Sequence, residues 1–174
     1  MNRRETTAFL SELVRRRLRQ ESCYWADEVC LDYGTTDVRR IDFMSFAPDS
    51  VVSVSGIEKG IFTCYEVKSC KADYNSGYGM NFVCEKNYLV MTMNTYKEIM
   101  YDEKLPWHVG ILVPVPFGDK LEDEFHNPTD YTNDINFELK IIKPSHPQLR
   151  KRSITELLFT MLRARQRMPE EVSE

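Results

Sequence analysis

Two charged side chains near the end of an apolar stretch are the first feature that could do chemistry. The stretch GIFTCYEVK, residues 60–68, has the composition of a β-strand, yet it carries Glu66 and Lys68. Because side chains alternate between the faces of a strand, Glu66 and Lys68 share one face, about 6.6–7 Å apart, and Val67 points to the other. The shared face must therefore contact water or be functional.

A second carboxylate lies in the preceding predicted strand. Asp42 interrupts the apolar part of residues 38–46, where an unpaired carboxylate would be costly. A hairpin through residues 47–59 would bring Asp42 beside Glu66. Two carboxylates offer the hard oxygen ligands that Mg²⁺ or Mn²⁺ prefers, and Lys68 would then orient or deprotonate a water molecule held by the metal. That is the chemistry of phosphodiester hydrolysis.

The elements that must position these residues follow from periodicity and turn composition. Apolar residues at helical spacing predict helices over residues 6–20, 94–105 and 148–168, the first with a Thr cap, the second with an Asn cap and the third strongly basic. Strand patterns cover residues 23–32, 38–46, 60–68, 86–92, 108–115 and 136–143, the last as an edge strand. Residues 69–83 contain Gly77 and Gly79, which indicates a short or broken helix and a loop. Residues 116–136 are acidic and contain Pro and Gly, so we expect an exposed loop there.

This order of elements predicts one α/β domain over residues 1–174. Short links between the first three strands favour an antiparallel meander, whereas strand, helix and strand across residues 60–92 favour a parallel crossover. We therefore expect a mixed central sheet flanked by helices. The length of 174 residues and the hydrophobic content of 42% suffice for one core of this kind.

Composition argues against a membrane protein, a zinc site and a disulfide framework. No window approaches the roughly 18 uncharged apolar residues of a membrane span, and the amino end lacks the pattern of a signal peptide. We therefore expect a protein of the bacterial cytoplasm, or of the host cytoplasm if a phage encodes it. The three histidines are far apart, and the five cysteines include no Cys-x-x-Cys pair. We expect the cysteines to be reduced, with Cys64 in the core.

Charge is strongly segregated along the chain. The formal net charge is −4, but residues 1–20 hold six Lys or Arg against two Asp or Glu, and residues 140–168 hold eight against one. A basic surface built from these segments would attract nucleic acid, with an affinity that falls as salt rises. The candidate phosphate contacts are Arg15, Arg16, Arg17, Arg150, Lys151 and Arg152. Most of them, taken singly, are also explained as the solvated side of an amphipathic helix. Tyr74, Tyr78 and Phe82 are candidates for stacking on unpaired bases, although core packing also explains Phe82.

The order of these residues resembles a known nuclease superfamily. Asp42, followed on the next strand by residues 66–68 (EVK) after an amino-terminal helix, is similar to the pattern of the PD-(D/E)XK superfamily. The longer motifs EVKSCKADY (residues 66–74) and EKNYLVM (residues 85–91) are similar to those of MmcB-like DNA-repair proteins and phage nuclease-like proteins. The resemblance spans roughly residues 36–165. It implies a restriction-endonuclease-like core of α-β-β-β-α-β order.

The resemblance also implies a role for each residue of the motif. Asp42, Glu66 and the backbone carbonyl of Val67 would hold Mg²⁺ or Mn²⁺, and Asp42, Glu66 and Lys68 would be catalytic. Further candidates for a role at the site, with a weaker case than these three residues, are Glu12, Ser69, Lys71 and Asp73. Two positions depart from the pattern: Ile41 stands where the superfamily name has Pro, and residues 77–79 (GYG) occupy a region where bacterial relatives often have Lys-Trp.

We therefore expect a metal-dependent DNA endonuclease that acts in DNA repair, recombination or phage DNA processing. Two alternatives on the same fold stay open: a nucleic-acid-binding module with little turnover, and an interaction module whose acidic residues 119–138 recruit another protein. A homodimer and a host or phage protein partner are also open. The decisive geometric expectation is that Asp42 and Glu66 converge on one site, with Lys68 facing it and Val67 buried behind.

Overall fold

The computed structural model describes residues 1–21, 23–50, 52–102, 105–131 and 135–165. Its elements, in chain order, are α1 (Arg3–Gln20), β1 (Tyr24–Leu31), β2 (Arg39–Ala47), α2 (Val54–Glu58), β3 (Ile61–Lys68), α3 (Lys71–Asn75), β4 (Lys86–Met91), α4 (Met93–Asp102), β5 (Gly110–Pro116), α5 (Leu121–His126), β6 (Phe137–Lys143) and α6 (Ile154–Arg165). None of these helices is long and apolar enough to span a membrane.

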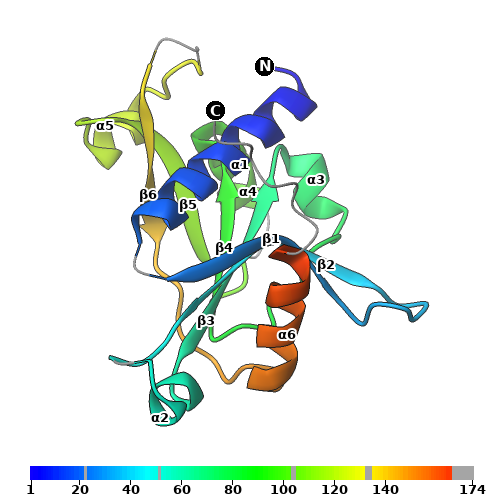
Figure 1. Cartoon of the computed structure of the whole chain (residues 1–174). Helices are drawn as coiled ribbons and strands as arrows, with labels where there is room; N and C mark the ends of the chain where they lie inside the picture. The colour runs from blue at the N-terminus through cyan, green and yellow to red at the C-terminus, as the bar shows by residue number, and fades with distance from the viewer. Residues whose placement is uncertain (22, 51, 103–104, 132–134, 166–174) are drawn as a thin grey trace, which may run out of the picture.

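The described strands form one mixed sheet, and their spatial order equals their order in the sequence. β1, β2 and β3 make an antiparallel meander, β3, β4 and β5 run parallel, and β6 closes the far edge antiparallel to β5. α3 and α4 lie in the two parallel crossovers, and the β1–β2 hairpin extends away from the body of the protein (Figure 1). The predicted α/β fold with a mixed sheet and flanking helices is confirmed, as is the edge position of β6.

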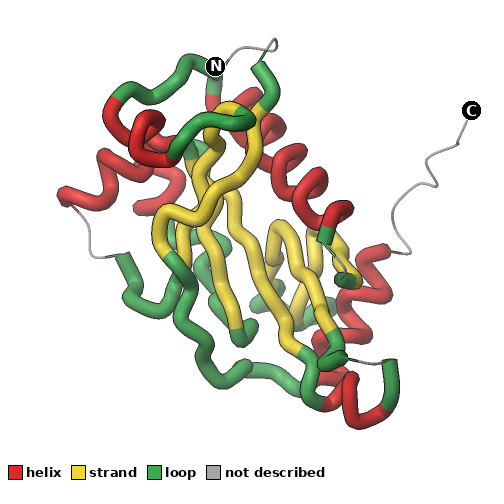
Figure 2. Tube along the Cα trace, turned by 90° about the vertical axis from the view of Figure 1, so that its left-hand side faces the viewer, coloured by secondary structure: helices red, strands yellow, loops and turns green. Residues whose placement is uncertain are grey.

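Both faces of the sheet are covered, and alternation along β3 decides which residue meets which helix. Val67 packs beneath α1 with Leu10. Phe62 points to the opposite face, where it lies in a cluster with Leu157 of α6. The β4 and β5 half of that second face is covered by α4 and α5. Figure 2 shows the resulting arrangement, one twisted sheet with helices around it.

Two helices are capped by residues other than those the sequence predicted. The Asn2 side chain accepts a hydrogen bond from the Glu5 backbone N at 2.9 Å, and the Glu5 carboxylate accepts one from the Asn2 backbone N at 2.8 Å. This capping box starts α1 earlier than the expected Thr cap. In α4 the Thr92 hydroxyl accepts from the Thr95 backbone N at 3.1 Å, so Thr92 takes the place predicted for Asn94.

The predicted exposed loop over residues 116–136 is wrong in its middle, which contains α5. Glu124 of α5 is buried and accepts hydrogen bonds from the Thr129 backbone N at 3.0 Å and from its hydroxyl at 2.7 Å. A carboxylate with donors of this kind tolerates burial. The acidic composition therefore wrongly predicted that Glu124 is exposed. The groups that donate hydrogen bonds to Glu124 follow α5 in the sequence, and only folding brings them into contact with its carboxylate.

The predicted basic helix over residues 148–168 is too long at its start. α6 begins at Ile154, so Arg150, Lys151 and Arg152 precede it in a segment without helical structure. The Lys151 backbone N donates to the Val83 carbonyl at 2.9 Å, which fastens this segment to the chain before β4. Parts of the predicted helices and loop at residues 103–104, 132–134 and 166–168 lie outside the described residues.

The expectation that all five cysteines are reduced is also wrong. Cys64 of β3 and Cys84, which precedes β4, form a disulfide with Cα atoms 5.8 Å apart. Both cysteines lie in the core cluster beneath α6. Cys23, Cys30 and Cys70 are free thiols. The prediction that Cys64 lies in the core is confirmed, but its pairing depends on a contact that spacing could not reveal.

Three basic residues of α1 form an ion pair or hydrogen bonds with other parts of the protein. Arg15 forms an ion pair of 3.2 Å with a carboxylate of β1. Arg16 donates to Asn136 Oδ1 at 2.6 Å and to a backbone carbonyl of β6 at 3.2 Å. Arg17 donates to another carbonyl of β6 at 3.1 Å. These contacts fasten α1 to strands at both edges of the sheet.

The basic residues before α6 are partnered in the same way, with one exception. An ion pair of 2.7 Å joins Arg150 to Glu85, and another of 2.7 Å joins Arg152 to Asp32. Lys151 is exposed. A DNA phosphate would have to compete with intramolecular partners at five of the six predicted contacts, which weakens the expectation that they form a DNA-binding surface.

We expect Arg16→Ala to lower the free energy of unfolding by about 1 kcal/mol, because it removes two hydrogen bonds between α1 and the region of β6. The matched control is Arg19→Ala, which removes an exposed pair with Glu12 at 3.3 Å and should cost less than about 0.5 kcal/mol. Urea denaturation followed by circular dichroism measures both changes. Equal losses in the two variants would contradict the structural role of Arg16.

Candidate active site

The pairing of β2 is interrupted at Asp42 on both sides. Toward β1, the ladder continues before and after this position but leaves out the opposite residue, Glu28, whose φ of 49° lies in the left-handed region. Toward β3, the ladder ends at Phe43 opposite Tyr65, one pair before Asp42 would meet Glu66. A further pair would set two carboxyl groups directly opposite each other, where ionisation of both would destabilise the sheet.

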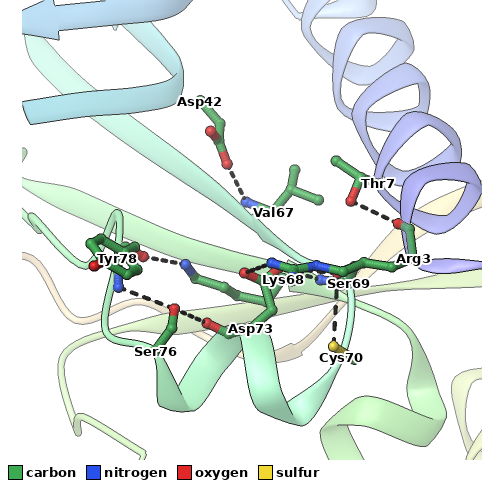
Figure 3. Close-up of polar contacts among 10 residues, drawn as sticks. All are labelled: Arg3, Thr7, Asp42, Val67, Lys68, Ser69, Cys70, Asp73, Ser76 and Tyr78. Atoms are coloured by element: carbon green, nitrogen blue, oxygen red, sulfur yellow. Dashed lines mark hydrogen bonds and ion pairs between the residues drawn. The ribbon is translucent and has the colours of Figure 1, made fainter.

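The Asp42 carboxylate takes over from the missing backbone pairing. The Val67 backbone N donates to Asp42 Oδ2 at 2.9 Å (Figure 3). Because a buried backbone N–H requires an acceptor, this bond keeps β2 attached to β3 where the two backbones separate. Val67 packs beneath α1, while Asp42, Glu66 and Lys68 line one pocket. The structure thus brings the three predicted catalytic side chains together.

Glu66 is a buried carboxyl in this pocket with a strongly raised pKa. It is 3% exposed, and its Oε1 has no hydrogen-bond partner among the described residues. Burial raises the pKa of Glu66 to about 9; the charge of Asp42 and hydrogen bonding with it add to the rise, whereas Lys68 and Arg40 oppose it. The Glu66 carboxyl of the metal-free protein is therefore neutral at pH 7.

A tight turn closes the other side of the pocket. Lys68, which is 3% exposed, donates from Nζ to the backbone carbonyl of Tyr78 (Figure 3). Gly77 and Gly79, on either side of Tyr78, have φ values of 70° and 73°. A Cβ on Gly79 would lie 2.6 Å from Glu66 Oε2. Glycine at position 79 therefore satisfies both the left-handed backbone and the close approach to the carboxyl.

Asp73 connects the end of β3 to the start of α1. Its Oδ2 accepts from the Ser69 backbone N at 3.1 Å and from the Ser69 hydroxyl at 3.0 Å, and its Oδ1 lies 2.9 Å from the Arg3 guanidinium. Burial alone would raise the pKa of Asp73, but the hydrogen bonds from Ser69 and the charges of Lys68 and Arg3 lower it below its ordinary value. Ser69 and Asp73 thus support the site, and Asp73 also lines the pocket.

The pocket has a volume of about 620 Å³ and contains arginines that the sequence analysis did not select. Arg3 enters from α1, and Arg39 and Arg40 enter from the start of β2. The available signal was the Arg-Arg pair just before Ile41 and Asp42, because strand alternation places Arg40 and Asp42 on the same side. The sequence analysis counted charges in the two terminal segments of the chain. It therefore missed this pair of arginines, which lies in the acidic middle of the chain.

Two residues of lower rank are not part of this pocket. Glu12 lies on the exposed side of α1 and pairs with Arg15 at 3.7 Å and with Arg19 at 3.3 Å. Lys71 is the first residue of α3 and does not line the pocket.

A larger cavity of about 960 Å³ lies between α2, α6 and the strands β1 and β2, but mainly apolar side chains line it. The buried titratable groups Glu66 and Lys68 therefore lie in the smaller, polar pocket.

The donor set of the pocket fits a hard divalent cation with few protein ligands. The described part of the chain holds no group of three or more His, Cys, Asp or Glu suited to a metal. A cation between Asp42 and Glu66 would take two carboxylates and complete its shell with water or backbone oxygen, as Mg²⁺ commonly does. It would also satisfy the unpartnered Oε1 of Glu66. The Val67 carbonyl as a further ligand stays a prediction.

Comparison with known proteins informs the fold of the chain. No protein family and no curated protein matches it. The chain is similar to a solved structure of a protein of unknown function from Silicibacter pomeroyi, with a TM-score of 0.53 and 17% sequence identity over 93% of this chain and 94% of that chain. This likeness supports the α/β fold along nearly the whole chain, and the chemistry must be argued from the site.

We expect Gly79→Ala to displace the Glu66 carboxyl, because the new Cβ would lie 2.6 Å from Oε2. Gly77→Ala is the matched control, since it has a similar φ of 70° but nothing within 4 Å of its Cβ. Both variants should lose about 1–2 kcal/mol of stability to the left-handed backbone. Only Gly79→Ala should weaken Mn²⁺ binding, by roughly 10- to 100-fold in calorimetric titration. Equal affinities in the two variants would argue against this packing.

Glu66 should make the folded protein less stable as pH rises. Its pKa is about 9 in the folded protein against an ordinary 4.5, so between these values the folded state retains a proton that the unfolded state has released. The resulting penalty is absent below about pH 4.5 and grows until about pH 9. Glu66→Gln should remove this dependence in urea denaturation, and Glu12→Gln should keep it. An unchanged pH profile in Glu66→Gln would show that the carboxyl is not buried as described.

Proposed function

We propose that this protein is a nuclease that uses Mg²⁺ or Mn²⁺ to hydrolyse phosphodiester bonds in DNA. The observation that carries the proposal is the buried carboxyl of Glu66 beside Asp42, with its Oε1 unpartnered, in a polar pocket that also contains Lys68. Strongly perturbed acids in clefts are concentrated at functional sites. An ordinary ion pair on a strand would be exposed and worth only about 0–1 kcal/mol.

Asp42 and Glu66 are the residues that would hold the cation. When bound, the cation would neutralise charge that develops on the phosphoryl group. A ligating carboxyl must be deprotonated, so cation binding displaces the proton of Glu66 and the affinity should rise with pH up to about 9. Asp42 is oriented for this role by the N–H of Val67.

Lys68 is suited to position the attacking water. Its ammonium group has three N–H donors, and the Tyr78 carbonyl accepts one of them. A water molecule and a phosphate oxygen can accept the other two. Arg40 lines the same pocket and can bind a non-bridging oxygen of the phosphate through a charge-assisted hydrogen bond, whereas Arg39 pairs with Asp37 at 3.0 Å.

The arrangement of elements supports DNA as the substrate through the resemblance. The order α1, β1, β2, β3, α3, β4 is the order of the superfamily core, with α2 inserted between β2 and β3. Asp42 lies on β2 and Glu66 and Lys68 lie on β3, which supports the roles that the resemblance implies. The proposal accordingly includes DNA repair, recombination or phage DNA processing, in a bacterial cytoplasm or in the host of a phage.

A nucleic-acid-binding module with little turnover is the second candidate, and one observation favours it. Two of the three predicted catalytic residues have partners within the protein, because Lys68 donates to the Tyr78 carbonyl and Asp42 accepts from the Val67 backbone N. Such a site could be retained to bind phosphate without cleaving it. The two candidates differ in whether a cation binds and whether a bond is broken.

Asp42→Asn and Lys68→Met should separate metal binding from catalysis. Asp42→Asn removes one of two charged ligands, so it should abolish Mn²⁺ binding in calorimetry and cleavage of labelled DNA. Lys68→Met keeps the side-chain length and both carboxylates, so it should retain Mn²⁺ while cleavage falls by about 10²–10⁴-fold. Lys59→Met is the control, since Lys59 is exposed and does not line the pocket, and it should cleave like the wild type.

The substrate for this assay is a mixture of duplex, nicked, flapped and single-stranded DNA. Wild-type protein that binds Mn²⁺ but cleaves none of these would favour the binding module. Wild-type protein that binds neither Mn²⁺ nor Mg²⁺ would refute the proposed mechanism.

A further inference from the structure

Tyr78 places an exposed aromatic ring at the pocket between Asp42, Glu66 and Lys68. Its side chain is 82% exposed, although the buried Lys68 holds its backbone carbonyl. The ring of Tyr78 is therefore exposed to solvent, while the Tyr78 backbone is held in the site by its hydrogen bond with Lys68 (Figure 3). Single exposed tyrosines are common on protein surfaces, but this one lines a polar pocket that contains the catalytic candidates.

Two arginines line the same pocket from the start of β2. Arg39 and Arg40 belong to the hairpin that extends from the body of the protein (Figure 1). Asn81 Nδ2 donates to the Arg40 carbonyl at 3.1 Å, so the segment that carries Tyr78 is joined to the strand that carries the arginines. The Arg40 side chain is 60% exposed, and its guanidinium lies 3.8 Å from the Glu28 carboxylate, a loose pair that a phosphate can replace. Arg39 pairs more closely, with Asp37 at 3.0 Å.

The size and lining of the pocket suit a nucleotide. Its volume of about 620 Å³ lies within the range of small-ligand sites, about 300–1,000 Å³. Guanidinium groups bind phosphate oxygens, and an aromatic face stacks on a base. Within a continuous duplex the neighbouring base pairs cover both faces of each base, so Tyr78 can stack only on a base that has left the stack.

We infer that the pocket binds a nucleotide of an unpaired DNA strand, with its phosphate on Arg40 and its base stacked on Tyr78. This inference rests on the proposed nuclease function and names its substrate class, unpaired DNA in preference to continuous duplex. The turn around Tyr78 then has two roles: its backbone holds Lys68, and its side chain selects the state of the strand.

The test is a binding measurement that needs no catalysis. Fluorescence anisotropy compares a labelled oligothymidylate with a labelled blunt duplex, both in EDTA. Tyr78→Ala should weaken oligothymidylate binding by about 5- to 100-fold and duplex binding by less than about twofold. Tyr78→Phe keeps the ring and should bind like the wild type. Tyr101→Ala is the matched control, because Tyr101 is 76% exposed and does not line the pocket.

The contact between Arg40 and a phosphate is tested by the salt dependence of DNA binding. Loss of one phosphate contact in Arg40→Ala should make the slope of log affinity against log salt shallower by about 0.7 for the single strand. Arg19→Ala removes a comparably exposed arginine of α1 that does not line the pocket, and it should leave this slope unchanged.

Three results would overturn the inference: oligothymidylate binding by Tyr78→Ala equal to wild type, an equal loss in Tyr78→Phe, or an equal loss for the duplex. Cleavage in Mn²⁺ tests the proposed function separately. If Tyr78→Ala and wild type cleave single strands and duplex alike, the nuclease stands and strand selection fails. If wild type binds oligothymidylate through Tyr78 but cleaves no DNA, the pocket stands and the nuclease fails.

Discussion

The hydrogen bond from the Val67 backbone N–H to the Asp42 carboxylate holds β2 and β3 together where their ladder ends. Without an acceptor, a buried N–H costs about 1–3 kcal/mol. A ladder continued by one pair would instead set Asp42 directly opposite Glu66, where ionisation of both carboxyl groups would cause repulsion. A side-chain acceptor resolves both conflicts. The pocket exists because the two strands separate at this point while remaining connected.

The chemistry of the pocket depends on how its buried charges are compensated. Asp73 has donors from Ser69 and an ion pair with Arg3, and Lys68 has the Tyr78 carbonyl. Glu66 has no such partner for Oε1, and it remains neutral at pH 7. A divalent cation would exchange the proton of Glu66 for a metal charge. Cation binding, proton release and the acidity of one carboxyl are therefore a single coupled equilibrium.

The basic residues of the protein divide into two groups that charge counting cannot separate. Arginines at the chain ends mostly hold elements together, as Arg16 does with Asn136, 120 positions away in the sequence. Arg39 and Arg40 lie in the otherwise acidic middle of the chain, and they line the pocket. A phosphate-binding role is better matched to Arg40, because its guanidinium lies 3.8 Å from Glu28 and it lines the pocket with the carboxylates, whereas Arg39 pairs with Asp37 at 3.0 Å.

The sequence by itself determined what local periodicity encodes: the α/β class, the strands, and the position of Glu66 and Lys68 opposite Val67. Alternation is a property of the extended backbone and needs no tertiary contact. The tertiary structure decided the charge state of Glu66, the Cys64–Cys84 disulfide, the burial of Glu124 within α5, and the approach of Arg39, Arg40 and Tyr78 to one pocket. Each of these depends on which groups from other segments come within a few ångströms. The solvation, hydrogen bonding and charge of a side chain depend on these near neighbours. A residue pattern along the chain does not reveal which neighbours they are.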